Sequence, residues 1–66
     1  MIERFSNRER EVIQLLAQGK SNAQIAESLR IEVSTVESHI HHVLSKLGFG
    51  SRTEIVVWWL RRGNNQ

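Results

Sequence analysis

Residues 21–48 read SNAQIAESLRIEVSTVESHIHHVLSKLG, and this stretch decides the fold. Its first part is short, with the apolar residues Ile25, Ala26 and Leu29 at the spacing of one inward helical face. A connector of about four residues, 30–33, leads to a longer amphipathic segment. The apolar residues of that segment fall within about 100° of arc on a helical wheel: Val36, Ile40, Val43, Leu44 and Leu47. The stretch therefore predicts two helices, near 22–29 and 35–47, in the order of a helix-turn-helix.

Helix start and stop signals extend this pattern to the rest of the chain. A serine is followed three residues later by Glu or Gln in four places, each a candidate capping box: Ser6 with Glu9, Ser21 with Gln24, Ser34 with Glu37, and Ser51 with Glu54. Gly19, Gly48 and Gly63 follow three of the segments, where a left-handed residue often ends a helix. We therefore expect an all-α four-helix bundle, with helices near 7–18, 22–29, 35–47 and 52–62. Residues 53–60 are rich in β-branched and aromatic types and also resemble a strand, but the chain has no second such run to pair with it.

Length and composition limit the class of protein. The chain has 66 residues, 39% of them hydrophobic and none of them cysteine. We expect one domain over 4–63 and a frayed tail over 64–66. No apolar run approaches the ~18 residues of a membrane span, and the first residues do not form a signal peptide. We expect a cytoplasmic protein without a membrane segment, and one too small to shelter an active site, so not an enzyme.

The charge is unevenly distributed. Nine basic and seven acidic residues give a net charge of only +2, and residues 31–45 contain neither Lys nor Arg. The basic residues gather toward the two ends of the chain. A basic face for a nucleic acid would therefore have to surround the third helix rather than lie on it.

Five spaced blocks of sequence resemble the LuxR-type (GerE or NarL/FixJ) DNA-binding domain. They are REREVIQLLAQG at 8–19, SNAQIA at 21–26, Thr35-Val36 with His39, KLG at 46–48, and Ser51-Arg52. The resemblance runs from about residue 5 to residue 59. It implies a bacterial transcription-factor domain that binds DNA as a dimer, with the third helix in the major groove and the fourth at the dimer contact. It also implies a receiver or ligand-binding sensor domain, or RNA polymerase, as partners in the full system.

The chain departs from this family at two positions near the third helix. The family usually has Ser where this chain has Glu32, so either the helix begins two residues later, at a Ser34 cap, or Glu32 is a poorer cap. The family often has a DNA-contacting Lys where this chain has Glu37. Glu37 can accept a hydrogen bond from cytosine N4 or can be the acid of a capping box with Ser34, and the sequence does not choose between the two.

The face of the third helix opposite its apolar stripe is the expected base-reading surface. It presents small hydroxyls and imidazoles flanked by one carboxylate, and all of these groups can hydrogen-bond bases: Ser34, Glu37, Ser38, His41 and His42. His39 and His42 are spaced as a metal-chelating pair, but no acidic or cysteine ligand accompanies them, so we expect neither a metal nor another cofactor. His39 is expected to pack against a neighbouring helix.

Phosphate anchoring is expected from residues at helix starts and from two cations beside the third loop: Lys20, Ser21, Asn22, Thr35, Lys46 and Arg52. In the alternative interpretation, Ser21 only caps its helix, and Lys46 and Arg52 are solvated charges.

The last helix carries more apolar surface than one face of a small bundle needs. Ile55, Val56, Trp59 and Leu60 are expected to complete the core. Val57, Trp58 and Arg61 then remain for a symmetric contact with a second copy, so we expect a homodimer. In the alternative interpretation, the core stripe is broad and Trp58 is half-buried over Phe49.

These features together predict sequence-specific binding of double-stranded DNA by a transcription regulator. The alternative is a protein-interaction module on the same fold that has lost base readout, which the acidic residues Glu32 and Glu37 favour.

Overall fold

The computed structural model describes residues 5–62, and within them it contains four α-helices and no strand. The helices are α1 (Asn7–Ala17), α2 (Asn22–Leu29), α3 (Val33–Leu47) and α4 (Arg52–Arg61). The predicted all-α fold is confirmed, and residues 53–60 are helical rather than extended. The predicted tail at 64–66, the stop signal at Gly63 and the two outermost residues of the predicted domain lie outside the described residues.

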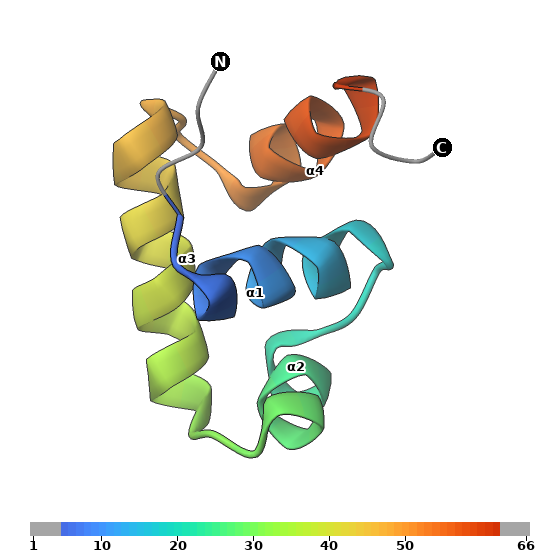
Figure 1. Ribbon diagram of the computed structural model, residues 1–66, viewed down its shortest axis with the longest axis vertical. Coiled ribbons are helices and arrows are strands. Elements are labelled where there is room, and N and C mark those ends of the chain that lie inside the picture. The colour runs from blue at the N-terminus through green and yellow to red at the C-terminus, as the bar shows by residue number, and fades with distance from the viewer. Residues whose placement is uncertain (1–4, 63–66) are drawn as a thin grey trace.

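The helices are arranged around α1, which lies between α4 on one side and α2 on the other (Figure 1). α3 runs along one end of this stack and contacts α1, α2 and α4. The α2–α3 pair is the predicted helix-turn-helix. α1 contacts both helices of the pair, and α4 contacts α1 and α3.

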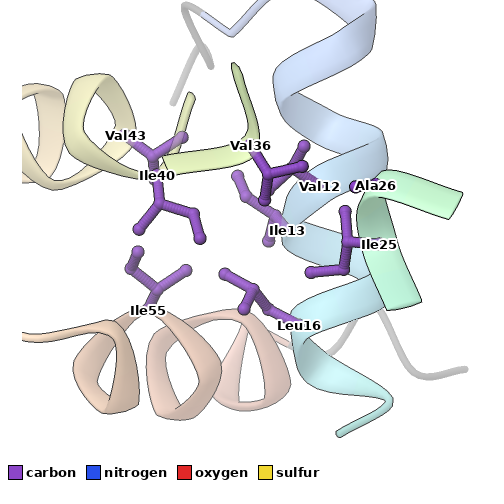
Figure 2. Close-up of a cluster of buried hydrophobic side chains, with 9 residues drawn as sticks. All are labelled: Val12, Ile13, Leu16, Ile25, Ala26, Val36, Ile40, Val43 and Ile55. Carbon is purple, nitrogen blue, oxygen red and sulfur yellow. The ribbon is translucent and has the colours of Figure 1, made fainter. Parts of the chain in front are cut away.

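Each helix contributes to one hydrophobic core (Figure 2). α1 supplies three buried side chains, α2 two, α3 three and α4 one: Val12, Ile13, Leu16, Ile25, Ala26, Val36, Ile40, Val43 and Ile55. The stripe predicted for α3 is buried at its first three positions, while Leu44 and Leu47 are only partly buried at its margin. α3 is therefore fixed to the bundle by one face, and its opposite face is exposed.

Capping boxes begin the first two helices as predicted. The Ser6 hydroxyl accepts from the Glu9 amide, and the Ser6 amide donates to the Glu9 carboxylate, both at 3.1 Å. At Ser21 the hydroxyl accepts from the Gln24 amide at 3.1 Å, and the Ser21 amide donates to the Gln24 side chain at 2.9 Å. At the start of α4 the Glu54 carboxylate accepts from the amides of Gly50 and Ser51, at 2.6 and 3.2 Å.

α3 begins two residues before the predicted position near 35. Glu32 is the cap residue, with no hydrogen bond from its side chain to the helix, and α3 begins at Val33. Ser34 therefore lies inside the first turn, and the predicted Ser34–Glu37 capping box does not form. Of the two alternatives left open for Glu32, the poorer cap is the one the fold adopts. The helix starts early because α2 ends abruptly and leaves only residues 30–32 as a connector.

The end of α2 explains that short connector. Arg30 has a left-handed backbone (φ 60°), as Gly19 and Gly48 do after α1 and α3. The following amide, of Ile31, donates to the Ala26 carbonyl at 3.0 Å, which closes the same type of turn as Lys20 and Phe49 close after the other two helices. The predicted end of α2 at residue 29 is confirmed, but the left-handed turn at Arg30 was not predicted, because no glycine marks it.

The remaining boundary differences are small, but one core assignment is wrong. α1 and α4 each end one residue earlier than predicted, at Ala17 and Arg61. Ile55 is fully buried and Val56 and Trp59 pack against the core, whereas Leu60 is 48% exposed. The side of α4 that faces the core carries Ile55, Val56, Trp58 and Trp59, and Leu60 lies outside it.

Candidate nucleic-acid interface

The predicted base-reading residues share one exposed surface of α3. Each of the five side chains is solvent-exposed, and the three core residues of the helix lie on the other side: Ser34, Glu37, Ser38, His41 and His42. The His41 and His42 rings lie 6.3 Å apart between centroids. Hydroxyls, imidazoles and a carboxylate on one continuous face provide both donors and acceptors for base edges.

The early start of α3 changes the interpretation of Glu37. It is the fifth residue of the helix instead of the acid of a capping box, so its carboxylate is not used to cap the helix. Exposed on the same surface as Ser34 and Ser38, it is available to a ligand. His39 is half-buried beside α1, close enough for its charge to act on Glu9.

Two of the predicted anchoring residues meet directly although they lie 30 positions apart. The Arg52 guanidinium donates to the side-chain oxygen of Asn22 at 2.8 Å, which joins the start of α4 to the start of α2. Lys20 and Ser21 precede Asn22 in the chain, and Ser21 also serves as the cap of α2. A guanidinium next to a helix start, where backbone amides lack partners, favours an anion. Thr35 lies apart from this cluster, half-buried in the first turn of α3.

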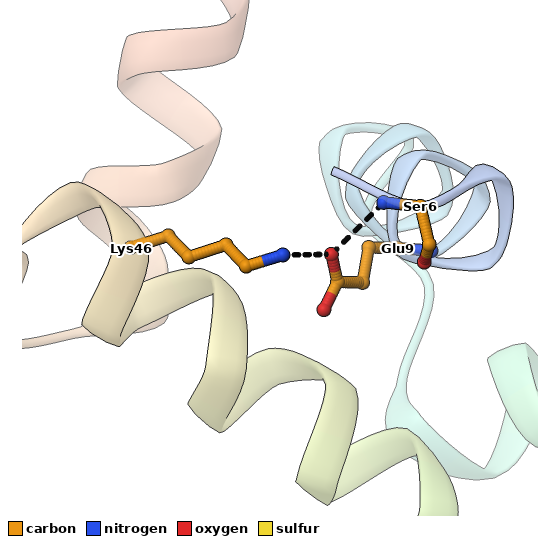
Figure 3. A network of polar contacts seen from close by, with 3 residues as sticks. All are labelled: Ser6, Glu9 and Lys46. Carbon is orange, nitrogen blue, oxygen red and sulfur yellow. Dashed lines mark hydrogen bonds and ion pairs between the residues drawn. The ribbon is translucent and has the colours of Figure 1, made fainter. Parts of the chain in front are cut away.

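Lys46 has a different environment from the other anchoring candidates. Its ammonium donates to Oε1 of Glu9 at 2.8 Å, and the same oxygen accepts from the Ser6 amide at 3.1 Å (Figure 3). Glu9 is only 6% exposed, so this carboxylate is buried. Burial by itself raises the pKa of Glu9, but the hydrogen bonds from Lys46 and Ser6 and the nearby charges of Lys46 and His39 outweigh it and lower that pKa.

The three predicted dimer residues border one groove of about 560 Å³ on the outside of α4. Its lining combines apolar, aromatic and charged side chains: Phe49, Thr53, Glu54, Val57, Trp58, Arg61 and Arg62. Val57 is 42% exposed, while Trp58 is half-buried.

Trp58 is part of an aromatic cluster that sequence reasoning only partly foresaw. Its ring meets Phe49 edge-on at 6.4 Å, as the alternative interpretation expected, and also Phe5 at 5.9 Å. The Arg62 guanidinium lies 5.0 Å from the Trp58 ring and 5.5 Å from the Trp59 ring. Trp58 therefore packs within the domain and also contributes to the groove.

Two further properties concern the described residues as a set. Within residues 5–62 no group of three or more His, Cys, Asp or Glu side chains is placed to hold a metal ion. Among the same residues, no helix has the length and apolar character needed to cross a membrane.

Comparison with known proteins identifies the family. Residues 3–59 match the model of the family described as bacterial regulatory proteins, luxR family. The chain belongs to this LuxR family. Its helix-turn-helix is thus the DNA-binding domain of a transcriptional regulator, a type of domain that binds DNA and is not an enzyme.

Individual relatives agree with this assignment. The LuxR-family domain is 43% identical over 63 residues to the uncharacterized transcriptional regulatory protein YxjL of Bacillus subtilis, covering 96% of this chain and 29% of YxjL. It is 44% identical over 58 residues to the oxygen regulatory protein NreC of Staphylococcus aureus, covering 88% of this chain and 27% of NreC.

A solved structure has the same fold. The domain superposes on the crystal structure of ChrA, the response regulator of a heme-sensing two-component system, with a TM-score of 0.83 and 39% identity, covering 94% of this chain and 31% of ChrA. The chain thus spans less than a third of the length of these relatives.

Proposed function

We propose that this LuxR-family domain binds double-stranded DNA in a sequence-specific manner, with α3 in the major groove, as a homodimer joined through α4. The observation that carries the proposal is the division of α3 into two sides. Val36, Ile40 and Val43 are buried on one side, and five polar side chains are exposed on the other.

The dimensions of α3 suit the major groove. An α-helix with its side chains is about 10–12 Å across, and the major groove is about 12 Å wide; with 15 residues, α3 is roughly 22 Å long and can contact several base pairs. In this proposal Ser34, Glu37 and Ser38 read bases from the N-terminal half of the helix, and His41 and His42 lie further along the same surface. Glu37 is assigned to a cytosine amino group, because an exposed carboxylate in an anionic groove is otherwise repelled.

Phosphate anchoring supports the same placement. The Arg52–Asn22 hydrogen bond links the first residues of α4 and α2, and Lys20 and Ser21 come directly before Asn22 in the chain, so we assign these four residues to the DNA backbone. Thr35 is assigned to a phosphate at the start of α3. Because these phosphate contacts are few, a single copy should bind DNA weakly, and affinity should depend on dimerisation.

The α4 groove is the proposed dimer surface. Val57 and Arg61 are exposed beside the half-buried Trp58, and an isologous contact places the same groove of each copy against the other. Trp58→Ala should weaken self-association with little loss of helicity. If it unfolds the monomer instead, Trp58 belongs to the core alone. Two recognition helices in such a dimer would read half-sites about 10 bp apart.

One observation favours the alternative, a protein-interaction module without base readout. Glu32 and Glu37 are both exposed near the start of α3, and Lys46, the only cation of that helix, is paired with Glu9. A basic or polar protein surface would suit this region.

Binding titrations separate the two functions. The 66-residue chain is titrated against a mixed-sequence duplex, and against duplexes selected from a random library, at two salt concentrations. DNA binding predicts affinity that falls steeply with salt, and a selected sequence bound more tightly than the mixture. Absence of salt-dependent binding to any duplex would leave the interaction module as the function.

The relatives suggest the wider setting. We propose that the domain works in the cytoplasm, where bacterial DNA lies, as the output part of a regulator with an N-terminal receiver or sensor domain, and that RNA polymerase is a further partner. Fusion of a candidate upstream domain to this chain, followed by a test of whether its signal alters DNA affinity, examines that arrangement.

A further inference from the structure

The ion pair between Glu9 and Lys46 connects the start of α1 to the end of α3, at the margin of the hydrophobic core. Glu9 is the third residue of α1, and Lys46 is the last but one of α3, 37 positions later. Because Glu9 Oε1 also accepts from the Ser6 amide, Lys46 is bound to the very start of α1 (Figure 3). The Lys46 ammonium also lies 5.5 Å from the centre of the Phe5 ring.

The burial of Glu9 favours the ion pair with Lys46 over a contact between Lys46 and DNA. The Glu9 side chain is 8% exposed and the Lys46 side chain 40% exposed. If the ammonium turned away to a DNA phosphate, it would leave a buried carboxylate without its cation, which is costly. Lys46 is partly exposed, but its ammonium already has a carboxylate partner within the domain.

Lys46 lies on the same helix as the proposed base-reading residues, and its pair with Glu9 can therefore affect how they are oriented. α3 is held by the buried Val36, Ile40 and Val43, and at its C-terminal end the partly buried Leu44 and Leu47 pack at the margin of the core beside the Lys46–Glu9 pair. Ser34 and Ser38 lie eight to twelve residues from Lys46, roughly 12–18 Å along the helix. A tilt allowed at the C-terminal end would therefore displace the side chains that face DNA.

We propose that Glu9 and Lys46 are positioning residues for DNA recognition: their ion pair sets the orientation of α3 on α1, and Lys46 acts through Glu9 instead of contacting a phosphate. The inference rests on the proposed DNA-binding function. It assigns a role to Glu9, a residue that contacts no ligand in that function.

The chain offers a matched control for Glu9. Glu11 lies two residues further along α1 and is also in an ion pair, with Arg8 at 3.2 Å, but that pair is exposed and stays within α1. Glu9→Gln and Glu11→Gln remove the same single negative charge from the same helix. Both variants therefore lose one negative charge from the first half of α1, but only Glu9→Gln removes the charge that pairs with Lys46 of α3.

The experiment measures DNA affinity for wild type, Glu9→Gln, Glu11→Gln, Lys46→Met and the double variant Glu9→Gln/Lys46→Met. The two probes are a duplex selected from a random library by the wild-type chain and a mixed-sequence duplex. All measurements are made where circular dichroism shows each variant to be fully folded. The glutamine can still accept from the Ser6 amide, and methionine keeps most of the alkyl chain of Lys46, so the local fold is disturbed as little as possible.

We expect Glu9→Gln to weaken binding to the selected duplex about fivefold, and Lys46→Met to do the same, because each removes one partner of a coupled pair. The double variant should be no weaker than either single one. Affinity for the mixed duplex should change less, so the ratio of specific to non-specific affinity falls. Glu11→Gln should leave that ratio unchanged.

Salt dependence gives a second readout that a phosphate contact would move. If Lys46 contacted a phosphate, Lys46→Met would reduce the slope of log affinity against log salt by about 0.9. We expect the slope of Lys46→Met to equal that of wild type. A reduced slope, or losses that add in the double variant, would overturn the inference.

The outcomes for the two proposals differ. No salt-dependent binding by the wild-type chain overturns the proposed function and this inference with it. DNA binding in which Glu9→Gln matches Glu11→Gln overturns the inference alone. If Glu9→Gln does not fold, Lys46→Met decides by its salt slope and its specificity ratio.

Discussion

Helices α3 and α4 are both amphipathic in sequence, yet they differ in how they meet the rest of the domain. α3 buries three side chains to 7% exposure or less and exposes a polar surface opposite them. α4 buries only Ile55 and leaves two large apolar side chains, Val57 and Leu60, 42% and 48% exposed. A polar exposed face suits a nucleic acid and an apolar one suits protein, and for this reason the proposed function assigns DNA to α3 and a second copy of the chain to α4.

The largest expected effect tests how α4 is attached. Ile55→Ala removes its one fully buried side chain and should lower the free energy of unfolding by about 2–5 kcal/mol. Leu60→Ala, on the same helix but exposed, should change it by no more than about 0.5 kcal/mol. Urea denaturation followed by tryptophan fluorescence measures both, since Trp58 and Trp59 lie in α4. Equal losses would mean that Leu60 contributes to the core after all.

The next effect tests the polar face of α3. If Glu37 reads a cytosine, Glu37→Gln should reduce discrimination at one base pair by about 1–3 kcal/mol and leave the other positions of the site unchanged. Binding to a panel of single-position variants of the selected duplex measures this. Tighter binding to every member of the panel would show that Glu37 only repels DNA.

A smaller effect compares the apolar face of α4 with an equally exposed site on α3. Val57 is 42% exposed and Val33 is 41% exposed. Val57→Ser should weaken self-association by about 1 kcal/mol, the loss of part of a buried apolar side chain, whereas Val33→Ser should not alter it. Sedimentation equilibrium of the two variants provides the measurement. Identical dimer constants would place the dimer contact elsewhere.

The smallest effect concerns the ion pair that attaches α3 to α1. The pKa of Glu9 is lowered in the folded protein, so its stabilising contribution is present above the ordinary glutamate pKa and is lost as pH falls through the lowered one. The free energy of unfolding should therefore decrease on acidification below about pH 5, and it should decrease less in Glu9→Gln. Parallel pH profiles for the two proteins would show that Glu9 contributes nothing.

The capping signals show how far local sequence predicts this fold. The patterns at Ser21–Gln24 and Ser34–Glu37 have the same spacing, yet only the first forms a box. The difference comes from Arg30, whose left-handed backbone ends α2 so tightly that the chain enters α3 at Val33. A left-handed arginine carries no sequence signal of the kind that glycine does.

The candidate site also has features that the sequence predicts and features that it does not. The exposed face of α3 was predictable because helical spacing places Ser34, Ser38 and His41 opposite the apolar stripe. The Asn22–Arg52 hydrogen bond was not, because it joins side chains 30 residues apart. The sequence also does not show that Lys46 is paired within the domain. Its partner Glu9 lies on a different helix, and the sequence identifies Glu9 only as the acid of the Ser6 capping box.

The amino-acid sequence alone determined the number of helices, their order, the LuxR-family resemblance and the polar face of α3. Each of these depends on neighbours within about one helical turn, or on motifs in a set order. The tertiary structure decided where α3 begins, that Leu60 is exposed, that Trp58 packs against two phenylalanines, and that the charge of Lys46 is held by Glu9. Those outcomes depend on which helices pack together, because they are set by contacts between side chains that are distant in the sequence.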